Sequence, residues 1–243
     1  DSVSAHQLPG SEGSDMPVWS PDSRWLLFVS EGKLKKIDTS GGLPEVLCDA
    51  KDTAVLGWNG QSTALLSFSL KGSAAVMPIQ QLGLDDCVVN PATTLDRSRY
   101  NVGQQWSRFL PDGRHFLYSG LRSNRKHDVL LASLGSEASQ VLLSNASDAK
   151  YVSPGYLLFQ RNGFLMAQPF DARKLRLHGE PVQVVTEQLA FGSYSGSANY
   201  DASDTGVLVY HPNSPVASKL VLRDSKGRPL KTLSTGLWLW AMR

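Results

Sequence analysis

The sequence predicts an all-β fold in which a four-stranded antiparallel module repeats along the chain. Three observations support this prediction. Apolar runs of strand length recur, turn residues separate them at similar intervals, and no helical spacing of apolar residues is sustained. The 243 residues are 41% hydrophobic, which is enough for a large core. We therefore expect a β-propeller, in which such modules stand as blades around a central channel.

The repeat is clearest in WSPDSRWLLFVS, residues 19–30, and FLPDGRHFLYSG, residues 109–120. Each begins with an aromatic residue, continues with Pro-Asp and ends in an apolar run. Proline presets φ for a turn and would cost a hydrogen bond inside a paired strand, so Pro-Asp marks the turn. The leading aromatic residues fall at positions 19, 58, 109, 151 and 200. A period of about 40–50 residues is typical of propeller blades.

These copies predict five blades, at residues 15–50, 54–90, 104–146, 148–188 and 197–235. The third strands are expected at KLKKID, AAVMPI, DVLLAS, FLMAQPF and KLVLRD, each after a turn that contains glycine or a polar residue. The second copy is the weakest because it lacks Pro-Asp, and residues 85–104 read as an insertion or a long connection. Residues 5–13 and 236–243 resemble strands of partial blades. We expect one propeller domain over residues 1–243, a fragment of a longer protein. Six blades suit the complete ring best, and a larger array stays open.

Net charge and composition limit the classes of partner that this chain can bind. The net charge of +2 gives no clustered basic face for nucleic acid, and no apolar run is long enough to enter a bilayer directly. The two cysteines, Cys48 and Cys87, form no disulfide framework and show no metal-ligand spacing. Two separate, small thiols are the favoured interpretation, although a bridge between them stays open.

No motif for catalysis or for a cofactor emerges. None of the five histidines is spaced for zinc, and positions at the solvent or the blade rim are favoured for them. The recurring Asp22, Asp112 and Asp204 suit turns better than a calcium site, which needs several oxygen ligands in one loop. The stretch FGSYSGSANY, residues 191–200, lacks the central serine of a nucleophile elbow. We therefore expect no enzyme activity, no cofactor and no metal.

The stretch MPVWSPDSRWLLFVSEGKLKKIDTSGGLPEVLCDA, residues 16–50, resembles the TolB-like, WD40-like propeller repeat. More narrowly, it resembles the C-terminal propeller region of bacterial receptor-type serine/threonine protein kinases and related regulators. The block LMAQPFD…L…GEP, residues 165–181, is the most specific part, because propeller geometry alone does not require it. The resemblance implies a bacterial, extracytoplasmic signalling context. The kinase motifs themselves are missing from this sequence.

Propellers commonly bind ligands with the loops on one face, because a rigid scaffold positions them. The loops that lead into the first strand of each blade supply nine candidate binding residues: Asp15, Lys51, Asp52, Tyr100, Asn101, Gln104, Asp148, Lys150 and Tyr194. Trp19, Trp25, Trp58 and Trp106 are expected to pack between blades, with stacking on a ligand as the alternative.

The primary hypothesis is a non-catalytic sensor or interaction module for a protein, a peptide, a glycan or another small molecule. The alternatives are a TolB-type envelope scaffold and a metal-dependent, lactonase-like hydrolase that uses the channel. The gating domain of a serine peptidase is a further enzymatic alternative, but it needs an α/β-hydrolase domain that this sequence lacks.

Overall fold

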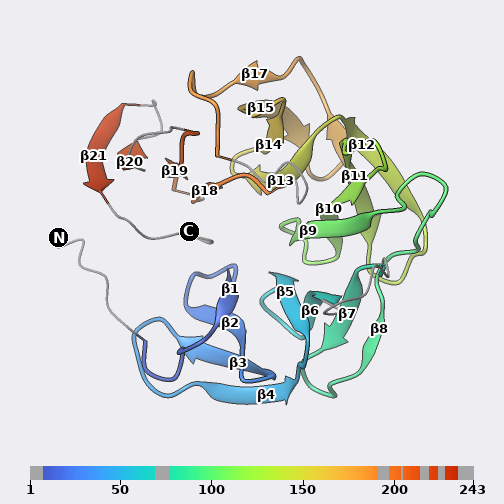
Figure 1. Ribbon diagram of the computed structural model, residues 1–243, viewed down its shortest axis with the longest axis vertical. Helices are drawn as coiled ribbons and strands as arrows, with labels where there is room; N and C mark the ends of the chain where they lie inside the picture. The colour runs from blue at the N-terminus through green and yellow to red at the C-terminus, as the bar shows by residue number, and fades with distance from the viewer. Residues whose placement is uncertain are drawn as a thin grey trace.

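The described part of the computed structural model comprises residues 8–68, 77–190, 197–203, 205–213, 219–223 and 228–234. Within it, strands β1 to β21 form five antiparallel sheets, each made from consecutive strands. Figure 1 shows the sheets arranged around a common centre, with the first strand of each sheet innermost. The described segments contain no helix that could cross a bilayer.

The sheets are numbered here as blades 1 to 5 in chain order. Blade 1 contains β1 (Asp15–Trp19), β2 (Trp25–Ser30), β3 (Lys33–Asp38) and β4 (Glu45–Asp49). Blade 2 contains β5 (Thr53–Trp58), β6 (Thr63–Phe68), β7 (Gln80–Gly83) and β8 (Val89–Pro91). Blade 3 contains β9 (Gly103–Phe109), β10 (His115–Leu121), β11 (His127–Ser133) and β12 (Ser139–Ser144). Blade 4 contains β13 (Ser147–Val152), β14 (Tyr156–Arg161), β15 (Phe164–Asp171), β16 (Arg176–Leu177) and β17 (Val182–Gln183). Blade 5 contains β18 (Tyr200–Ala202), β19 (Leu208–Tyr210), β20 (Lys219–Arg223) and β21 (Pro229–Ser234).

The five predicted blades are confirmed, with boundaries that agree to within a few residues. The predicted third strand of blade 2, at residues 74–79, is wrong for residues 77–79, whereas residues 74–76 lie outside the described residues. Residues 77–79 are irregular and β7 follows at Gln80–Gly83, where Thr63 pairs with Gly83. Residues 8–13 form turns rather than an outer strand, while residues 1–7 and 236–243 lie outside the described residues.

Neighbouring blades bury their flat faces against each other, because an apolar sheet face must be covered. Leu34 and Val55 belong to one buried cluster that joins blades 1 and 2. Leu65 and Phe116 belong to another between blades 2 and 3. Corresponding clusters join blades 3 and 4, and blades 4 and 5. The core of the described residues is therefore a series of four interfaces between consecutive blades, which fixes the innermost strands relative to one another.

A disulfide between Cys48 and Cys87 joins β4 of blade 1 to the β7–β8 turn of blade 2. The interpretation of two separate thiols is therefore wrong. The two cysteines are 39 residues apart in sequence, and only the packing of neighbouring blades brings them together. The bond covalently links the outer edges of two blades.

Candidate functional site at the central channel

A cavity of about 320 Å³ lies where the innermost strands of all five blades end. We call the face at which β1, β5, β9, β13 and β18 begin the entry face, and the face at which they end the exit face. The cavity opens among the turns that follow these strands, and so belongs to the exit face. Its lining includes Val18, Trp19, Gly57, Trp58, Arg108, Phe109, Lys150, Tyr151, Asp201 and Ala202, two consecutive residues from each innermost strand.

The repeated register of the blades brings equivalent residues to this cavity. One position near the end of each innermost strand is equivalent in the five blades, because its residue pairs with the second or third residue of the next strand. The residues at this position are Val18, Gly57, Arg108, Lys150 and Asp201. Each directly precedes the lead position of its copy. In blade 5 that lead position is Ala202 rather than Tyr200, since Ala202 pairs with Leu208 at the start of β19. The predicted lead aromatic of blade 5 was thus placed two residues too early.

Gly57 gives this position no side chain in blade 2. A Cβ atom there would lie 3.1 Å from the carbonyl oxygen of Ser107 in the neighbouring blade. That separation is tighter than ordinary van der Waals contact, and a backbone carbonyl cannot easily give way. Glycine therefore allows the innermost strands of blades 2 and 3 to approach closely beside the cavity.

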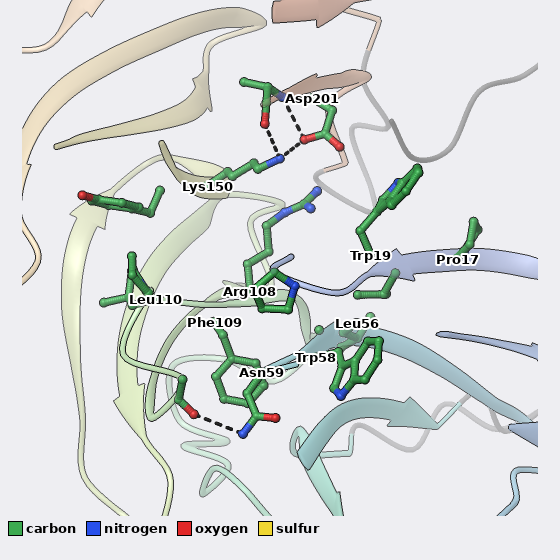
Figure 2. Close-up of a pocket in the computed structure, with 17 residues that line it drawn as sticks. Pro17, Trp19, Leu56, Trp58, Asn59, Arg108, Phe109, Leu110, Lys150 and Asp201 are labelled. Atoms are coloured by element: carbon green, nitrogen blue, oxygen red, sulfur yellow. Dashed lines mark hydrogen bonds and ion pairs between the residues drawn. The ribbon is translucent and has the colours of Figure 1, made fainter. Parts of the chain in front are cut away.

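The charged part of the site is a set of ion pairs that link blades 3, 4 and 5. Arg108 Nη2 lies 3.4 Å from Asp148 Oδ1. The other carboxylate oxygen of Asp148 accepts a hydrogen bond from the backbone N–H of Ala198, at 3.0 Å. Lys150 Nζ contacts Asp201 Oδ1 and donates to the carbonyl oxygen of Ala202, at 2.7 Å. Figure 2 shows Arg108, Lys150 and Asp201 converging at one side of the cavity.

A β-bulge explains how Asp148 reaches this position. The register of β13 and β14 shifts between Ser147 and Lys150, and Asp148 adopts a φ of 49°. A bulged residue leaves the regular alternation of a strand and turns its side chain in a new direction. The backbone N–H of Asp148 donates to Ser119 Oγ in blade 3, at 2.9 Å, instead of to the neighbouring strand.

Burial sets the protonation of these groups. Burial raises the pKa of the Asp148 carboxyl, and the nearby Arg108 opposes that rise. Burial also acts to lower the pKa of Arg108, but Asp148 and Asp201 outweigh it, so the pKa of Arg108 is raised and its guanidinium stays charged. Burial, followed by the charge of Asp148, places the pKa of Tyr200 well above its ordinary value. The phenol of Tyr200 is therefore a neutral hydrogen-bond donor next to the ion pair.

Much of the remaining cavity lining is apolar. It is formed by Trp19, Trp58 and Phe109 together with three prolines, Pro17, Pro21 and Pro111. Figure 2 shows Trp19 beside Arg108 and Trp58 below it. Trp58 is buried in the core between blades 1 and 2, as predicted, and its Nε1 donates to the carbonyl oxygen of Gln61, at 3.2 Å. Trp19 is only half-buried and lines the cavity, and for it the stacking on a ligand stays a prediction.

The nine predicted binding residues do not gather at one place. Lys51 and Asp52 lie in an exposed turn before β5, and Asn101 is exposed before β9. Asp15 begins β1, but the structure does not describe its side chain. Tyr194 lies outside the described residues. Among these nine, Lys150 is the one that lines the exit-face cavity.

Three of the nine are buried in internal hydrogen bonds. The hydroxyl of Tyr100 donates to Asp128 Oδ2, at 3.0 Å. Gln104 donates from Nε2 to the carbonyl oxygen of Thr94, at 3.0 Å, and accepts from the hydroxyl of Thr93. Asp148 is held as described above. These bonds order the connection that precedes β9 and the start of β13. Ligand binding by these residues stays a prediction.

Arg108 and Asp201 are the site residues that sequence reasoning missed. Each directly precedes the lead position of its copy. Successive side chains of a strand point to opposite sides, so a lead residue that packs between blades predicts that the residue before it points toward the channel. That signal was available for Arg108 but was hidden for Asp201 by the misplaced lead position. Among the described residues, no three His, Cys, Asp or Glu side chains are grouped to hold a metal ion.

No protein-family model matches the sequence, and neither does any curated protein. Among solved structures, TolB from Acinetobacter baumannii matches with a TM-score of 0.63 and 18% identity, over 92% of this chain and 55% of that one. The fold is a TolB-like β-propeller. The propeller also matches regucalcin, a calcium-binding protein from Agrobacterium tumefaciens, with a TM-score of 0.58 and 13% identity, over 90% of this chain and 73% of that one.

A prolyl endopeptidase also contains such a propeller, with a TM-score of 0.56 and 15% identity over 92% of this chain and 35% of that one. The chain spans about half the length of the Acinetobacter TolB that it matches. At these identities the likeness concerns the fold. Propellers of this shape occur in proteins of different function, so function has to be argued from the site.

Proposed function

We propose that this chain is a non-catalytic interaction module, which binds an extended segment of a partner protein at the exit-face mouth of the channel. The observation that supports this proposal is the composition of the cavity, which Trp19 and three prolines line together with Arg108 and Lys150. Protein interfaces are enriched in aromatic and arginine side chains, and such anchors contribute most of the binding energy. All five blades contribute to the lining, so the scaffold holds it in one shape.

The setting that we propose is the extracytoplasmic part of a bacterial signalling protein. The resemblance of residues 16–50 and 165–181 to the propeller region of bacterial receptor-type kinases supports the signalling role. The Cys48–Cys87 disulfide supports the location, because disulfides persist in oxidising compartments and are rare in the cytosol.

The lactonase-like alternative gains no support from the described residues. Its channel would need carboxylates free to bind a cation. Among the described residues, Asp201 lines the cavity and Asp148 lies beside it, and both are instead paired, with Lys150 and Arg108 respectively. A TolB-type scaffold would also bind a protein. It differs from the proposed sensor in that it would bind its partner permanently rather than in response to a signal.

The test is selection of a displayed library of twelve-residue peptides on the whole chain, followed by affinity measurements on two variants. Trp19→Ala removes the half-buried ring that lines the cavity, and Trp25→Ala removes a half-buried ring of blade 1 that does not. We expect Trp19→Ala to weaken the selected peptides by about tenfold or more, as for an interface anchor. Trp25→Ala should leave the affinity unchanged.

Equal losses for both tryptophan variants, in chains whose circular dichroism is unchanged, would show that the selected peptides bind elsewhere. Thermal unfolding with Ca²⁺ or Mn²⁺, together with assays on ester and lactone substrates, tests the hydrolase. Metal-dependent turnover by the pure chain would contradict a non-catalytic module.

A further inference from the structure

A second hollow, which shares no residue with the channel cavity, lies on the entry face between blades 3 and 4. It has a volume of about 790 Å³. The β10–β11 turn, the end of β12 and the β14–β15 turn form its walls, and the segment at Glu180 and Pro181 closes one side. We call it the entry groove. Its size falls in the range of ligand sites, which is about 300–1,000 Å³.

The entry groove carries an excess of positive charge. Arg125, Lys126 and Arg161 line it, while Glu180 is the single carboxylate in its lining. Within the described segments, no carboxylate lies in ion-pair distance of these three cations. Arg122, next to the groove, is paired with Asp128 at 3.1 Å. Unpaired cations gathered in a concave surface favour an anionic ligand.

Arg161 is held in place before any ligand arrives. Its guanidinium stacks over the ring of Phe159, with the central carbon 5.0 Å from the ring centroid. Nη2 is 3.4 Å from the carbonyl oxygen of Ser144, and Nε is buried without a hydrogen-bond partner. A guanidinium fixed on a ring loses little entropy on binding and offers paired N–H groups to a carboxylate.

The floor of the entry groove is polar although it is buried. Gln160, Gln168 and His127 are 6%, 9% and 9% exposed. For His127 this corrects the predicted position at the solvent or the rim. Gln160 accepts a hydrogen bond from Ser147, at 3.0 Å, and Gln168 donates one to the carbonyl oxygen of Gly179, at 2.8 Å. These bonds fix the amides, each of which can both donate to and accept from a peptide group.

We propose that the entry groove binds an acidic peptide segment, whose carboxylates pair with Arg161, Arg125 and Lys126. Two features favour a peptide over an anionic glycan. β12, which borders the groove, is the outermost strand of its sheet, so an extended chain can lie along its edge. No Phe, Tyr or Trp ring is among the described residues that line the groove, so a sugar would find no such stacking surface. This site is independent of the channel mouth and does not rest on the function proposed there.

The test is a titration of the ¹⁵N-labelled whole chain with the capped peptide EAEAEA, followed by NMR. The neutral peptide QAQAQA serves as the control ligand, and a chondroitin sulfate tetrasaccharide serves as the anionic glycan. We expect EAEAEA to shift the Nε–H signal of Arg161 and the backbone signals of residues 125–127. Neither the neutral peptide nor the glycan should do so at equal concentration.

Three variants locate the contact. Arg161→Gln and Lys126→Gln should each weaken binding of EAEAEA, by about fivefold for the stacked arginine and about twofold for the exposed lysine. Lys51→Gln removes an equal charge from an exposed turn on the same face, but outside the groove, and should change nothing. Lys126→Gln keeps the test valid if the Arg161 variant proves unstable, because Lys126 is exposed.

Equal weakening by Lys51→Gln would show diffuse electrostatic attraction and overturn the site. Tighter binding of the glycan than of EAEAEA, with the same signals shifted, would overturn the assignment to a peptide. Saturating EAEAEA without any movement of the Arg161 Nε–H signal would refute the proposal outright.

Discussion

Arg108 on β9 lies 3.4 Å from Asp148 on β13, so an ion pair joins the innermost strands of blades 3 and 4. Beside it, Lys150 and Asp201 join blades 4 and 5 in the same way. Propeller blades are otherwise held together mainly by apolar faces, which specify contact but not register. We infer that this charged set fixes the angular order of three blades around the channel, where a small displacement would change the shape of the cavity.

Removing the carboxylate of Asp148 should destabilise the chain strongly. Asp148→Ala leaves Arg108 and the N–H of Ala198 without their partner, and breaking a buried pair from one side costs about 3–5 kcal/mol. Asp148→Asn should cost less, since an amide oxygen still accepts from Ala198. Urea unfolding followed by tryptophan fluorescence measures both. A loss for Asp148→Ala no larger than about 0.5 kcal/mol would contradict the inferred role of the pair.

The pH dependence of this contribution has a definite sign. Burial raises the pKa of Asp148 in the folded chain above its unfolded value, so the folded state binds the proton more tightly. The contribution of this carboxyl to the free energy of unfolding is therefore largest below the unfolded pKa. It declines as pH rises through the folded pKa. Subtracting the unfolding free energies of Asp148→Asn from those of the wild type between pH 3 and 8 should show this decline. A difference that grows with pH would reverse the inferred sign.

Two lysine–aspartate pairs allow the stabilisation from a buried ion pair to be compared with that from an exposed one. The side chains of Lys150 and Asp201 are 17% and 10% exposed, whereas those of Lys33 and Asp49 are 48% and 84% exposed. Lys150→Gln should therefore lower the unfolding free energy by several kcal/mol, and Lys33→Gln by about 0–1 kcal/mol. Double-mutant cycles with Asp201→Asn and Asp49→Asn give the coupling energies. Similar couplings for the two pairs would mean that burial adds nothing at the channel.

Reduction of the Cys48–Cys87 disulfide should loosen blades 1 and 2. A bridge that closes a loop of 39 residues stabilises a fold by about 2–4 kcal/mol, mainly by restricting the unfolded chain. The variant with Cys48→Ser and Cys87→Ser should lose this amount relative to the oxidised wild type, and reducing agent should not affect it further. Hydrogen exchange should quicken in β4 and β8 before it does in blade 4. Uniform quickening over all blades would argue against a local link.

The carboxyl of Asp38 offers a test of turn chemistry. The hydroxyl and backbone N–H of Ser40, followed by the guanidinium of Arg24, lower the pKa of Asp38 to about 2. A lowered pKa means that stability from this turn is present above the ordinary value of 3.8 and is lost as pH falls toward 2. An NMR titration of the side-chain carboxyl carbon should show this value. In Ser40→Ala it should move back toward 3.8, and an unchanged pKa would rule out the hydroxyl as its main cause.

The sequence alone determined the blades of this protein, because strand periodicity and turn residues act over a few neighbouring positions. Trp19, Pro21 and Asp22 mark the start of a blade by local rules that need no knowledge of the rest of the chain. The same locality explains the error in blade 2, where the turn signal is weak and the third strand was placed too early.

Only the tertiary structure decided the site. Lys150 and Asp201 are 51 residues apart, Arg108 and Asp148 are 40 apart, and the disulfide spans 39. Nothing in a single strand favours one distant partner over another, since charge pairing depends on which blades become neighbours and on a bulge that turns Asp148 out of its strand. Packing of the ring makes that choice, and with it the chemistry of the channel.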